Sequence, residues 1–453
     1  MTEAIRQRLN DSPIARWTVL FIVATAMMMG YFVNDIMSPL ETLLEMPRSQ
    51  GGLGWTPSDY GFFSGAGSFI NVFLLMLFFS GIILDKMGIR FTGTLACSLM
   101  VLGTLIKYYA VTADFDDTIH YSLFTIHLPP SVMMASLGFA IFGVGYEMTG
   151  ITVSKAMVRW FTGHELALAM GLQLAMARFG TAAALSISAP IARHYTLSTP
   201  LLVALAFLII GLLAFLVFCV MDHKLDFSVP ADTAGTEKFR LSDIGITLRN
   251  PGFWLITIFC VLFYSAVSPF LKFSTKLMVM KYGVDPDLAG FFSSIAPFGT
   301  MLFTPLFGLI YDRYGKGVTL VIIGALMLTA VHFGFSMPIH SATVAIALMV
   351  ILSIGYSLAP AALWPCVPKI IPLKCLGTAY SMIFFIQNFG RAIIPMCVGK
   401  ANETDPSYTT SMLIFGFTTL GAAVTAIAML YVDRKKSYGL QLPNIAQGVR
   451  NDV

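Results

Sequence analysis

Five charged side chains lie inside long apolar stretches of this 453-residue chain: Asp35, Glu147, Arg178, Lys272 and Arg391. A charged group at the centre of a membrane-spanning helix costs about 2.5–3.5 kcal/mol on insertion scales, so it usually faces a cavity or an opposite charge. Asp35 and Lys272 lie nearer the ends of their stretches and could extend toward the membrane surface. Glu147 and Arg178 are therefore the strongest candidates for a functional site.

Glu147 lies in a segment of small residues, Gly143 to Gly150, and Arg178 lies near the middle of the next apolar stretch. A short loop joins the two stretches, so we expect antiparallel neighbours with both charges at similar depth. A carboxylate can hold an ammonium group, and a guanidinium can bind a carboxylate through two hydrogen bonds. Together they would hold both ends of a zwitterion. The structural alternative is an ion pair between Glu147 and Arg178 that only fastens the two helices.

Neutral polar groups occur at similar depth in the second part of the chain. Tyr264, Trp364, Gln387 and Asn388 offer a hydroxyl, an indole and two amides that could bind a peptide amide or flank a side chain. For each of them, taken alone, ordinary packing is the favoured interpretation.

The sequence does not favour metal or cofactor chemistry. The six cysteines lie in or beside apolar stretches without C-x-x-C spacing, and His332 is the one histidine well inside such a stretch. We interpret these residues as packing residues. We therefore expect no metal, no cofactor and no enzymatic activity.

The elements that position these residues follow from composition. Apolar residues make up 57% of the chain, charged residues 11%, and the mean hydropathy is +0.78, which excludes a soluble enzyme, a disordered scaffold and a fibrous repeat. The net charge of +4 is scattered, so nucleic acid is not an expected partner. Backbone groups in lipid must be bonded internally, and the apolar stretches are thus predicted to be helices. Twelve are predicted, at residues 17–40, 61–84, 91–111, 131–154, 166–192, 200–221, 251–275, 288–311, 318–338, 343–367, 375–398 and 409–432.

These spans predict an all-α membrane protein in two parts. We expect an N-terminal tail (1–16), a six-helix bundle (17–221), a linker (222–250), a second six-helix bundle (251–432) and a C-terminal tail (433–453). Nineteen of the 28 Lys and Arg residues fall in the tails and in the loops on one side, which predicts that both termini are cytoplasmic. The opposite side is assigned six: Arg48, Lys107, Arg193, Lys276, Lys281 and Lys400.

A motif, G-x-x-x-D-[KR]-x-G, occurs once in each half. The first copy contains Gly81, Asp85, Lys86 and Gly88 and is followed by Arg90; the second runs from Gly308 through Asp312 and Arg313 to Gly315. The two copies occupy matching positions in the two halves of the chain, which predicts two parallel six-helix repeats. An acid at a helix end can pair with groups of the neighbouring bundle, which would make a latch between two conformations. The alternative is a solvated turn whose charges only set topology.

The segment from Gly81 to Arg90 resembles the loop motif of the major facilitator superfamily. Three further segments resemble the lysosomal dipeptide transporter branch of that superfamily: Trp160 to Arg178, Tyr356 to Pro365, and Gly377 to Asn388. The resemblance implies the major facilitator fold and peptide contacts by Glu147 and Arg178. It also favours cavity positions for Trp364, Gln387 and Asn388, and it matches Asp35 and Asn71 to the branch.

Two departures from the branch affect specificity. The branch lysine near residue 275 is replaced by Thr275, with Lys272 one turn earlier, and Arg391 is not a feature of the branch. An additional cation could favour a more anionic substrate. The leading hypothesis is a secondary transporter of dipeptides or similar zwitterions that works by alternating access. The alternatives are a transporter of organic or phosphorylated anions and, in another class, an intramembrane receptor or enzyme.

The expected partners are a small-molecule substrate and the lipid bilayer, and a monomer would suffice. The N-terminal segment lacks an acidic dileucine signal, so we expect a bacterial inner membrane, or a lysosomal membrane if the source is eukaryotic.

The latch hypothesis gives a first prediction. Asp85→Asn should slow transport with little change in substrate affinity, because a latch changes the balance between conformations and not the contacts of the site. Asp312→Asn should have a weaker effect of the same kind. Transport and binding would be measured on the same reconstituted protein; loss of binding in a folded variant would exclude the latch.

Overall fold

The computed structural model describes residues 12–116, 121–123, 126–161, 165–226, 245, 247–371 and 376–443. Apart from loops, these ranges are helical, with one antiparallel hairpin, β1 (Tyr121–Leu123) and β2 (Ile126–Leu128). Most of the predicted N-terminal tail, most of the predicted linker and the end of the predicted C-terminal tail lie outside the described residues.

The chain forms helices on both sides of the linker. Those before it are α1 (Pro13–Asp35), α2 (Glu41–Glu45), α3 (Pro57–Ala66), α4 (Phe69–Phe73), α5 (Met76–Thr112), α6 (Pro130–Phe161), α7 (Leu166–His194) and α8 (Thr199–Asp226). Those after it are α10 (Pro251–Met280), α11 (Pro286–Tyr314), α12 (Gly317–Ser336), α13 (Ala342–Leu363), α14 (Val367–Ile370), α15 (Leu376–Thr404) and α16 (Thr409–Lys436). Short 3-10 turns are η2 (Ser38–Leu40), η3 (Arg48–Gln50) and η5 (Trp364–Cys366).

Within the described residues, 11 helical segments are long and apolar enough to cross a membrane. The prediction of twelve continuous spans fails at residues 61–84, which the structure divides among α3, α4 and the start of α5. Leu75, between α4 and α5, has a left-handed backbone with φ 54°. An L-residue in that conformation interrupts a right-handed helix, so this crossing is built from short pieces.

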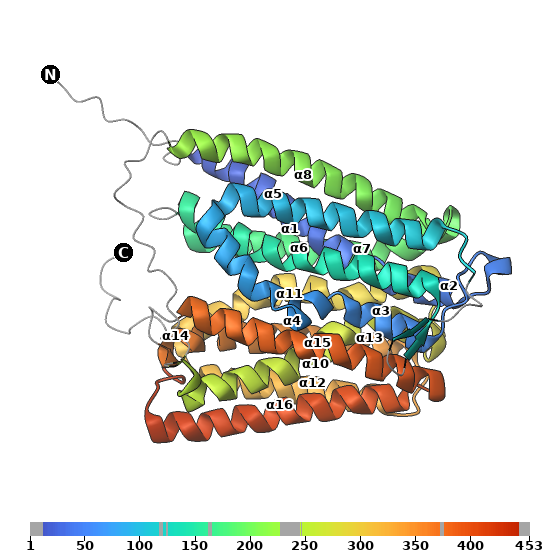
Figure 1. The fold of residues 1–453 in the computed structure, drawn as a ribbon. Coiled ribbons are helices and arrows are strands. Elements are labelled where there is room, and N and C mark those ends of the chain that lie inside the picture. The colour runs from blue at the N-terminus through green and yellow to red at the C-terminus, as the bar shows by residue number, and fades with distance from the viewer. Residues whose placement is uncertain are drawn as a thin grey trace.

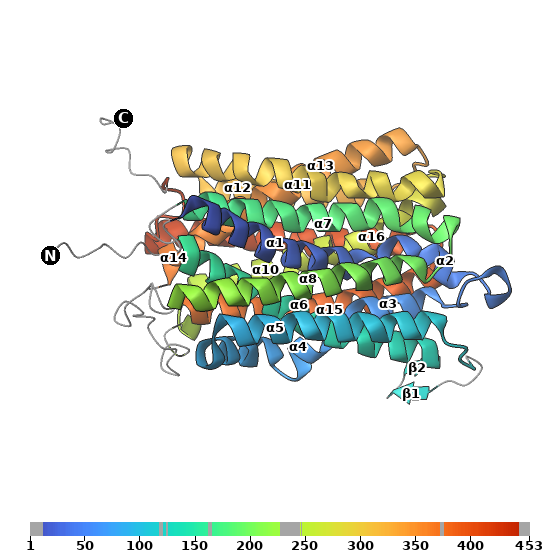
Figure 2. The ribbon, with the colours of Figure 1, turned by 90° about the horizontal axis from the view of Figure 1, so that it is seen from above.

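The long helices run side by side along one direction (Figures 1 and 2). We call the side where α1 begins and α16 ends the terminal side, and the opposite side, which carries α2 and the β1–β2 hairpin, the distal side. Helices α1 and α5–α8 pack mainly on one another, and so do α10–α13, α15 and α16. The first half (12–226) and the second half (247–443) meet mainly where α7 packs on α11 and α3 packs on α15.

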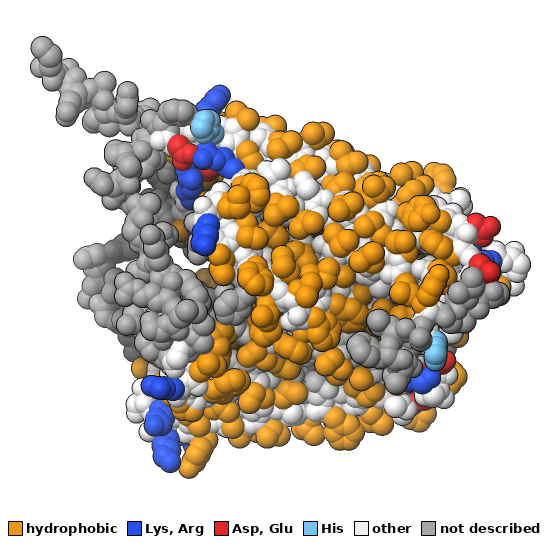
Figure 3. Space-filling model, viewed as in Figure 1, with side chains coloured by type: hydrophobic (Ala, Val, Ile, Leu, Met, Phe, Trp, Pro, Cys, Tyr) orange, Lys and Arg blue, Asp and Glu red, His pale blue; other side chains and the backbone are white. Residues whose placement is uncertain are grey.

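The surface is apolar around the middle of the bundle. Hydrophobic side chains cover the central part of the face in Figure 3, while Lys, Arg, Asp and Glu gather at its two ends. On α8, Leu213 and Val217 are 57% and 54% exposed. So extensive an apolar surface requires lipid around it. The protein is a multi-pass membrane protein.

Two lysines assigned to distal loops are instead buried in helices. Lys107 lies inside α5 with 1% of its surface exposed, and Lys276 lies inside α10 with 5% exposed. Lys281 directly follows α10 and is also buried, at 6% exposure. These cations therefore belong to the interior and carry no information about orientation.

Glycines allow the two halves to approach closely at the distal side. A Cβ atom on Gly399 of α15 would lie 2.8 Å from the Cα of Gly61 in α3 and 2.5 Å from the carbonyl oxygen of Pro57. A Cβ on Gly65 would lie 2.3 Å from the carbonyl oxygen of Ala392. Only glycine permits this backbone contact, which closes the distal side between α3 and α15.

Gly399→Ala should therefore force α3 and α15 apart and lower the melting temperature of the purified protein by several degrees, because overpacking typically costs about 1–3 kcal/mol. Gly171→Ala in α7 is the matched control, since a Cβ there meets nothing within 4 Å. Equal melting temperatures for the two variants would contradict the close contact.

Candidate functional site

A cavity lies between the halves near the middle of the bundle. It is small and is bounded by α1, α3 and α6 of the first half and by α10 and α15 of the second. Its lining includes Glu147, Lys272 and Arg391. Three of the five charged residues predicted from the sequence thus meet at one place.

Glu147 is paired with the opposite half. Its Oε1 accepts a hydrogen bond from Nη1 of Arg391 on α15 at 2.8 Å, and each of these side chains is 19% exposed. The structural alternative of a Glu147–Arg178 ion pair is therefore wrong. The pattern of residues did not predict Arg391, 244 residues away, as the partner.

Arg178 has an aromatic environment. Its Nη1 donates to Oη of Tyr356 at 3.1 Å, and its guanidinium carbon lies 5.2 Å from the centroid of the same ring. No Asp or Glu among the described residues lies within ion-pair distance of Arg178. This guanidinium can therefore donate hydrogen bonds to the carboxylate of a bound molecule.

Asp35 and Lys272 join α1 to α10 across the two halves. Lys272 Nζ donates to Asp35 Oδ1 at 2.7 Å and also to the carbonyl oxygen of Asn34, while Thr181 Oγ1 donates to Asp35 Oδ2 at 3.0 Å. Asp35 is 7% exposed and Lys272 is 8% exposed. Neither side chain extends to the membrane surface, so that expectation is wrong.

Lys107 is a buried cation that the sequence analysis missed. Its Nζ lies 3.4 Å from the carbonyl oxygen of Val33, 4.9 Å from the ring centroid of Phe139 and 4.5 Å from that of Phe142. The sequence did indicate burial, because residue 107 falls inside the predicted span 91–111. Its assignment to a loop on the opposite side was wrong.

Two predicted amides lie next to the cavity. Asn388 Oδ1 accepts hydrogen bonds from Ser68 Oγ at 3.1 Å and from Arg391 at 3.4 Å. Asn71 donates to the carbonyl oxygen of Gly143 at 3.1 Å, and its Oδ1 is buried without a partner in the described structure. Gln387 is also buried, with a similarly unpartnered Oε1. Asn71 Oδ1 and Gln387 Oε1 can therefore each accept a further hydrogen bond close to the site.

Tyr264 and Trp364 form a second group. Trp364 Nε1 donates to Tyr264 Oη at 3.2 Å, and the centroids of the two rings lie 6.2 Å apart. Of the eight residues predicted to bind substrate, Glu147 is the one that lines the cavity. Arg178, Tyr264, Trp364 and the other four lie outside its lining.

The distal side of the site is closed. Lys276 of α10 pairs with Glu41 at 3.2 Å and with Glu45, and Tyr60 Oη donates to the carbonyl oxygen of Lys272 at 3.1 Å. These contacts all join the two halves. The site is therefore closed on its distal side.

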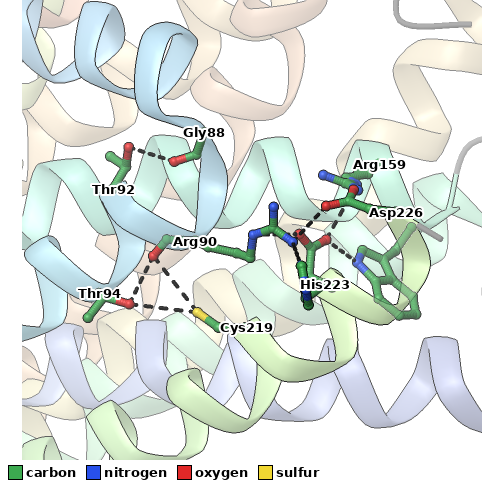
Figure 4. Close-up of polar contacts among 10 residues, drawn as sticks. Gly88, Arg90, Thr92, Thr94, Arg159, Cys219, His223 and Asp226 are labelled. Carbon is green, nitrogen blue, oxygen red and sulfur yellow. Dashed lines mark hydrogen bonds and ion pairs between the residues drawn. The ribbon is translucent and has the colours of Figure 1, made fainter. Parts of the chain in front are cut away.

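Arg90, which follows the first motif copy, fastens helices within the first half. It pairs with Asp226 at 2.7 Å and contacts His223 at 3.1 Å, so α5 is tied to the end of α8 (Figure 4). Arg159 pairs with the fully buried Asp222 at 3.3 Å, and Trp160 Nε1 donates to the same carboxylate at 3.0 Å. This terminal cluster makes α5, α6 and α8 one unit.

Other residues of the first copy lie at the end of the broken crossing. Gly88 has φ 79°, which turns α5 sharply, and Lys86 is exposed. A Cβ on Gly81 would meet nothing within 4 Å. The side chain of Asp85 lies outside the described residues, so the latch stays a prediction.

The second copy is covered by residues 437–443, which follow α16. The backbone N–H of Lys316 donates to the carbonyl oxygen of Gln441 at 2.7 Å, and Tyr311 Oη donates to that of Leu440 at 3.2 Å. Arg313 lies over the ring of Tyr314 at 5.7 Å, and Asp312 is half-buried. The two copies therefore have different surroundings.

Within the described part of the chain, no group of three or more His, Cys, Asp or Glu residues could hold a metal ion. Cys375 lies outside that part.

Comparison with known proteins places this geometry in a family. The model of the Major Facilitator Superfamily matches residues 118–395. The chain belongs to this superfamily. Its relatives include proteins named lysosomal dipeptide transporter MFSD1: that of Danio rerio is 29% identical over 82% of this chain and 78% of its own length, and that of Homo sapiens is 27% identical over 81% and 76%. The resemblance to this branch of superfamily transporters is confirmed.

Solved structures of the superfamily share the fold. A peptide transporter of the POT family bound to alafosfalin aligns with a TM-score of 0.69 over 93% of this chain and 95% of its own, at 14% identity. Such low identity establishes the helical architecture alone. The protein is accordingly a transporter of the major facilitator superfamily.

The Asp35–Lys272 bridge gives a prediction for this site. Asp35→Asn leaves Lys272 buried without its carboxylate, and breaking a buried pair typically costs about 3–5 kcal/mol, so the melting temperature should fall markedly. Asp35→Asn combined with Lys272→Met should recover much of the loss. A double variant no more stable than Asp35→Asn would show that the two side chains do not depend on each other.

Proposed function

We propose that the protein transports dipeptides or similar small zwitterions by alternating access. The observation that carries this proposal is Arg178, a guanidinium without a carboxylate partner among the described residues, on the helix that follows α6, whose Glu147 lines the cavity. A substrate carboxylate binds Arg178, and a substrate ammonium binds Glu147 in place of Arg391. The name of the MFSD1 relatives supports the same substrate class.

Two six-helix bundles, residues 17–221 and 251–432, are the moving parts in this proposal. Their helix contacts correspond: α5–α6 matches α12–α13, α1–α7 matches α10–α15, and the cross-half contact α7–α11 matches α3–α15. This correspondence supports two parallel repeats with a connecting segment between them. The distally sealed arrangement is then one end state, and opening the distal side requires separation of Lys276 from Glu41 and Glu45.

The terminal side faces the cytoplasm in this proposal, because most Lys and Arg residues outside the spans lie there. The membrane is a bacterial inner membrane, or the lysosomal membrane if the source is eukaryotic. Asp85 and Asp312 act as latches on the terminal side. Asp35 seals the site, while Asn71, Gln387, Asn388, Tyr264 and Trp364 supply polar and aromatic contacts around it.

A transporter of organic anions is the second candidate. The specific observation in its favour is that Arg391 and Arg178 bring two guanidinium groups to the site. Glu147 argues against this candidate. Its carboxylate repels a substrate anion that carries no ammonium group of its own.

Replacement of Arg178 tests the carboxylate contact. Arg178→Lys should weaken dipeptide binding by about tenfold or more, because an ammonium cannot reproduce the planar two-bond fork. Uptake of a radiolabelled dipeptide into proteoliposomes should fall in parallel. Arg434→Lys, at an exposed position in the last turn of α16, is the matched control. Undiminished uptake by Arg178→Lys would remove Arg178 from the site.

End-blocked peptides test the zwitterion contacts. Two extended residues span about 7 Å, so one dipeptide can reach an acid and a base on opposite walls of a cavity. An N-acetylated dipeptide should bind poorly to wild type and lose little more on Glu147→Gln, and a dipeptide amide should behave likewise with Arg178→Lys. Equal binding of blocked and free dipeptides to wild type would contradict the zwitterion contacts.

A further inference from the structure

Basic side chains outnumber acidic ones around the cavity. Near the middle of the bundle the described residues include two acidic groups, Asp35 and Glu147, and four basic groups, which are Lys107, Arg178, Lys272 and Arg391. The distal group of Glu41, Glu45 and Lys276 adds two acidic groups and one basic group. Five basic side chains therefore lie among four acidic ones.

The four central cations differ in their capacity for a new partner. Lys272 is occupied by Asp35 and by the carbonyl oxygen of Asn34. Lys107 is almost fully buried behind the Phe139 ring, over which Lys272 also lies, at 5.4 Å from the centroid. Arg178 and Arg391 are the two that remain available to a substrate.

Arg391 has unused donors. Its hydrogen bonds to Glu147 and to Asn388 both come from Nη1, and its Nη2 and Nε have no hydrogen-bond partner within the described structure. The side chain lines the cavity and is 19% exposed. A guanidinium in this position can bind a carboxylate through the free Nη2 and Nε edge.

Binding of a zwitterion would change the partner of Arg391. When a substrate ammonium takes Glu147, Arg391 loses its carboxylate, and an unpaired charge in a low-dielectric site is costly. A second carboxylate on the substrate would replace Glu147 as the partner of Arg391. The ammonium then binds Glu147, the main carboxylate binds Arg178, and the side-chain carboxylate binds Arg391, so that every charge is paired.

We infer that the transporter selects dipeptides with an acidic side chain, of net charge −1, and that Arg391 determines this specificity. The inference rests on the proposed dipeptide transport and adds the class of substrate. It predicts that acidic dipeptides bind most tightly, neutral dipeptides less tightly and basic dipeptides most weakly. It also assigns Arg391 a direct contact with the substrate in place of a purely structural ion pair.

The test compares isosteric dipeptides on the purified full-length protein. Alanyl-glutamate should bind about tenfold or more tightly than alanyl-glutamine, since a hydrogen bond to a charged group contributes about 1.5–3 kcal/mol. Alanyl-lysine should bind most weakly. Arg391→Gln should bring the glutamate-to-glutamine ratio close to one without weakening alanyl-glutamine, because Glu147 is then free for the ammonium. Arg313→Gln, at the exposed terminal end, should leave the ratio unchanged.

Lowering the pH provides a second measurement that does not depend on a variant. The glutamate side chain of the peptide has a pKa of about 4.3. Below that pH, the ratio of alanyl-glutamate to alanyl-glutamine affinity should approach one. Effects of pH on the protein itself are common to both peptides and cancel in the ratio. Equal binding of the two peptides to wild type at neutral pH, or an unchanged ratio in Arg391→Gln, would overturn the inference while leaving dipeptide transport in place. If no dipeptide bound and glutarate did, both proposals would fail and the anion transporter would replace them.

Discussion

The pairing of buried charges between the two halves is the constraint on which the rest of the structure depends. A charged group in the middle of a membrane protein must find an opposite charge or leave the lipid-surrounded interior. Here Asp35 meets Lys272, Glu147 meets Arg391, and Glu41 meets Lys276, and each pair joins an element of the first half to one of the second. These pairs, with the glycine contact between α3 and α15, hold the distal side closed.

In the transport that we propose, the same pairs link binding to conformation. A substrate that takes Glu147 would remove Arg391 from a bond between the halves, and would so change the free energy of the interface as well as that of its own site. Lys272 lines the cavity, but its ammonium and the Asp35 carboxylate are occupied by protein groups, which in this proposal suits them to sealing and not to recognition. Arg178 differs from them, because it has no carboxylate partner among the described residues.

Each half is fastened internally by different means at the terminal side. In the first half, Arg90 and Arg159 bind the acidic end of α8 (Figure 4). In the second half, Lys369 donates to the carbonyl oxygen of Leu442 at 2.7 Å, and Asp433 Oδ1 accepts from the backbone N–H of Leu440 at 3.0 Å, so residues 437–443 take the place of a direct ion pair. In the alternating access that we propose, internal fastening of this kind would let each half move as one body while the contacts between the halves break and form.

The sequence by itself determined the class of protein, the extent of most spans and five of the buried charged residues, because composition and apolar length are local properties that decide whether a segment crosses a membrane. Tertiary structure decided their partners. Glu147 pairs with a residue 244 positions away, Lys107 turns inward from the end of α5, and the predicted span 61–84 breaks at Leu75. Each outcome depends on how helices distant in sequence are rotated and stacked against one another, and a one-dimensional pattern of residue types does not contain that information.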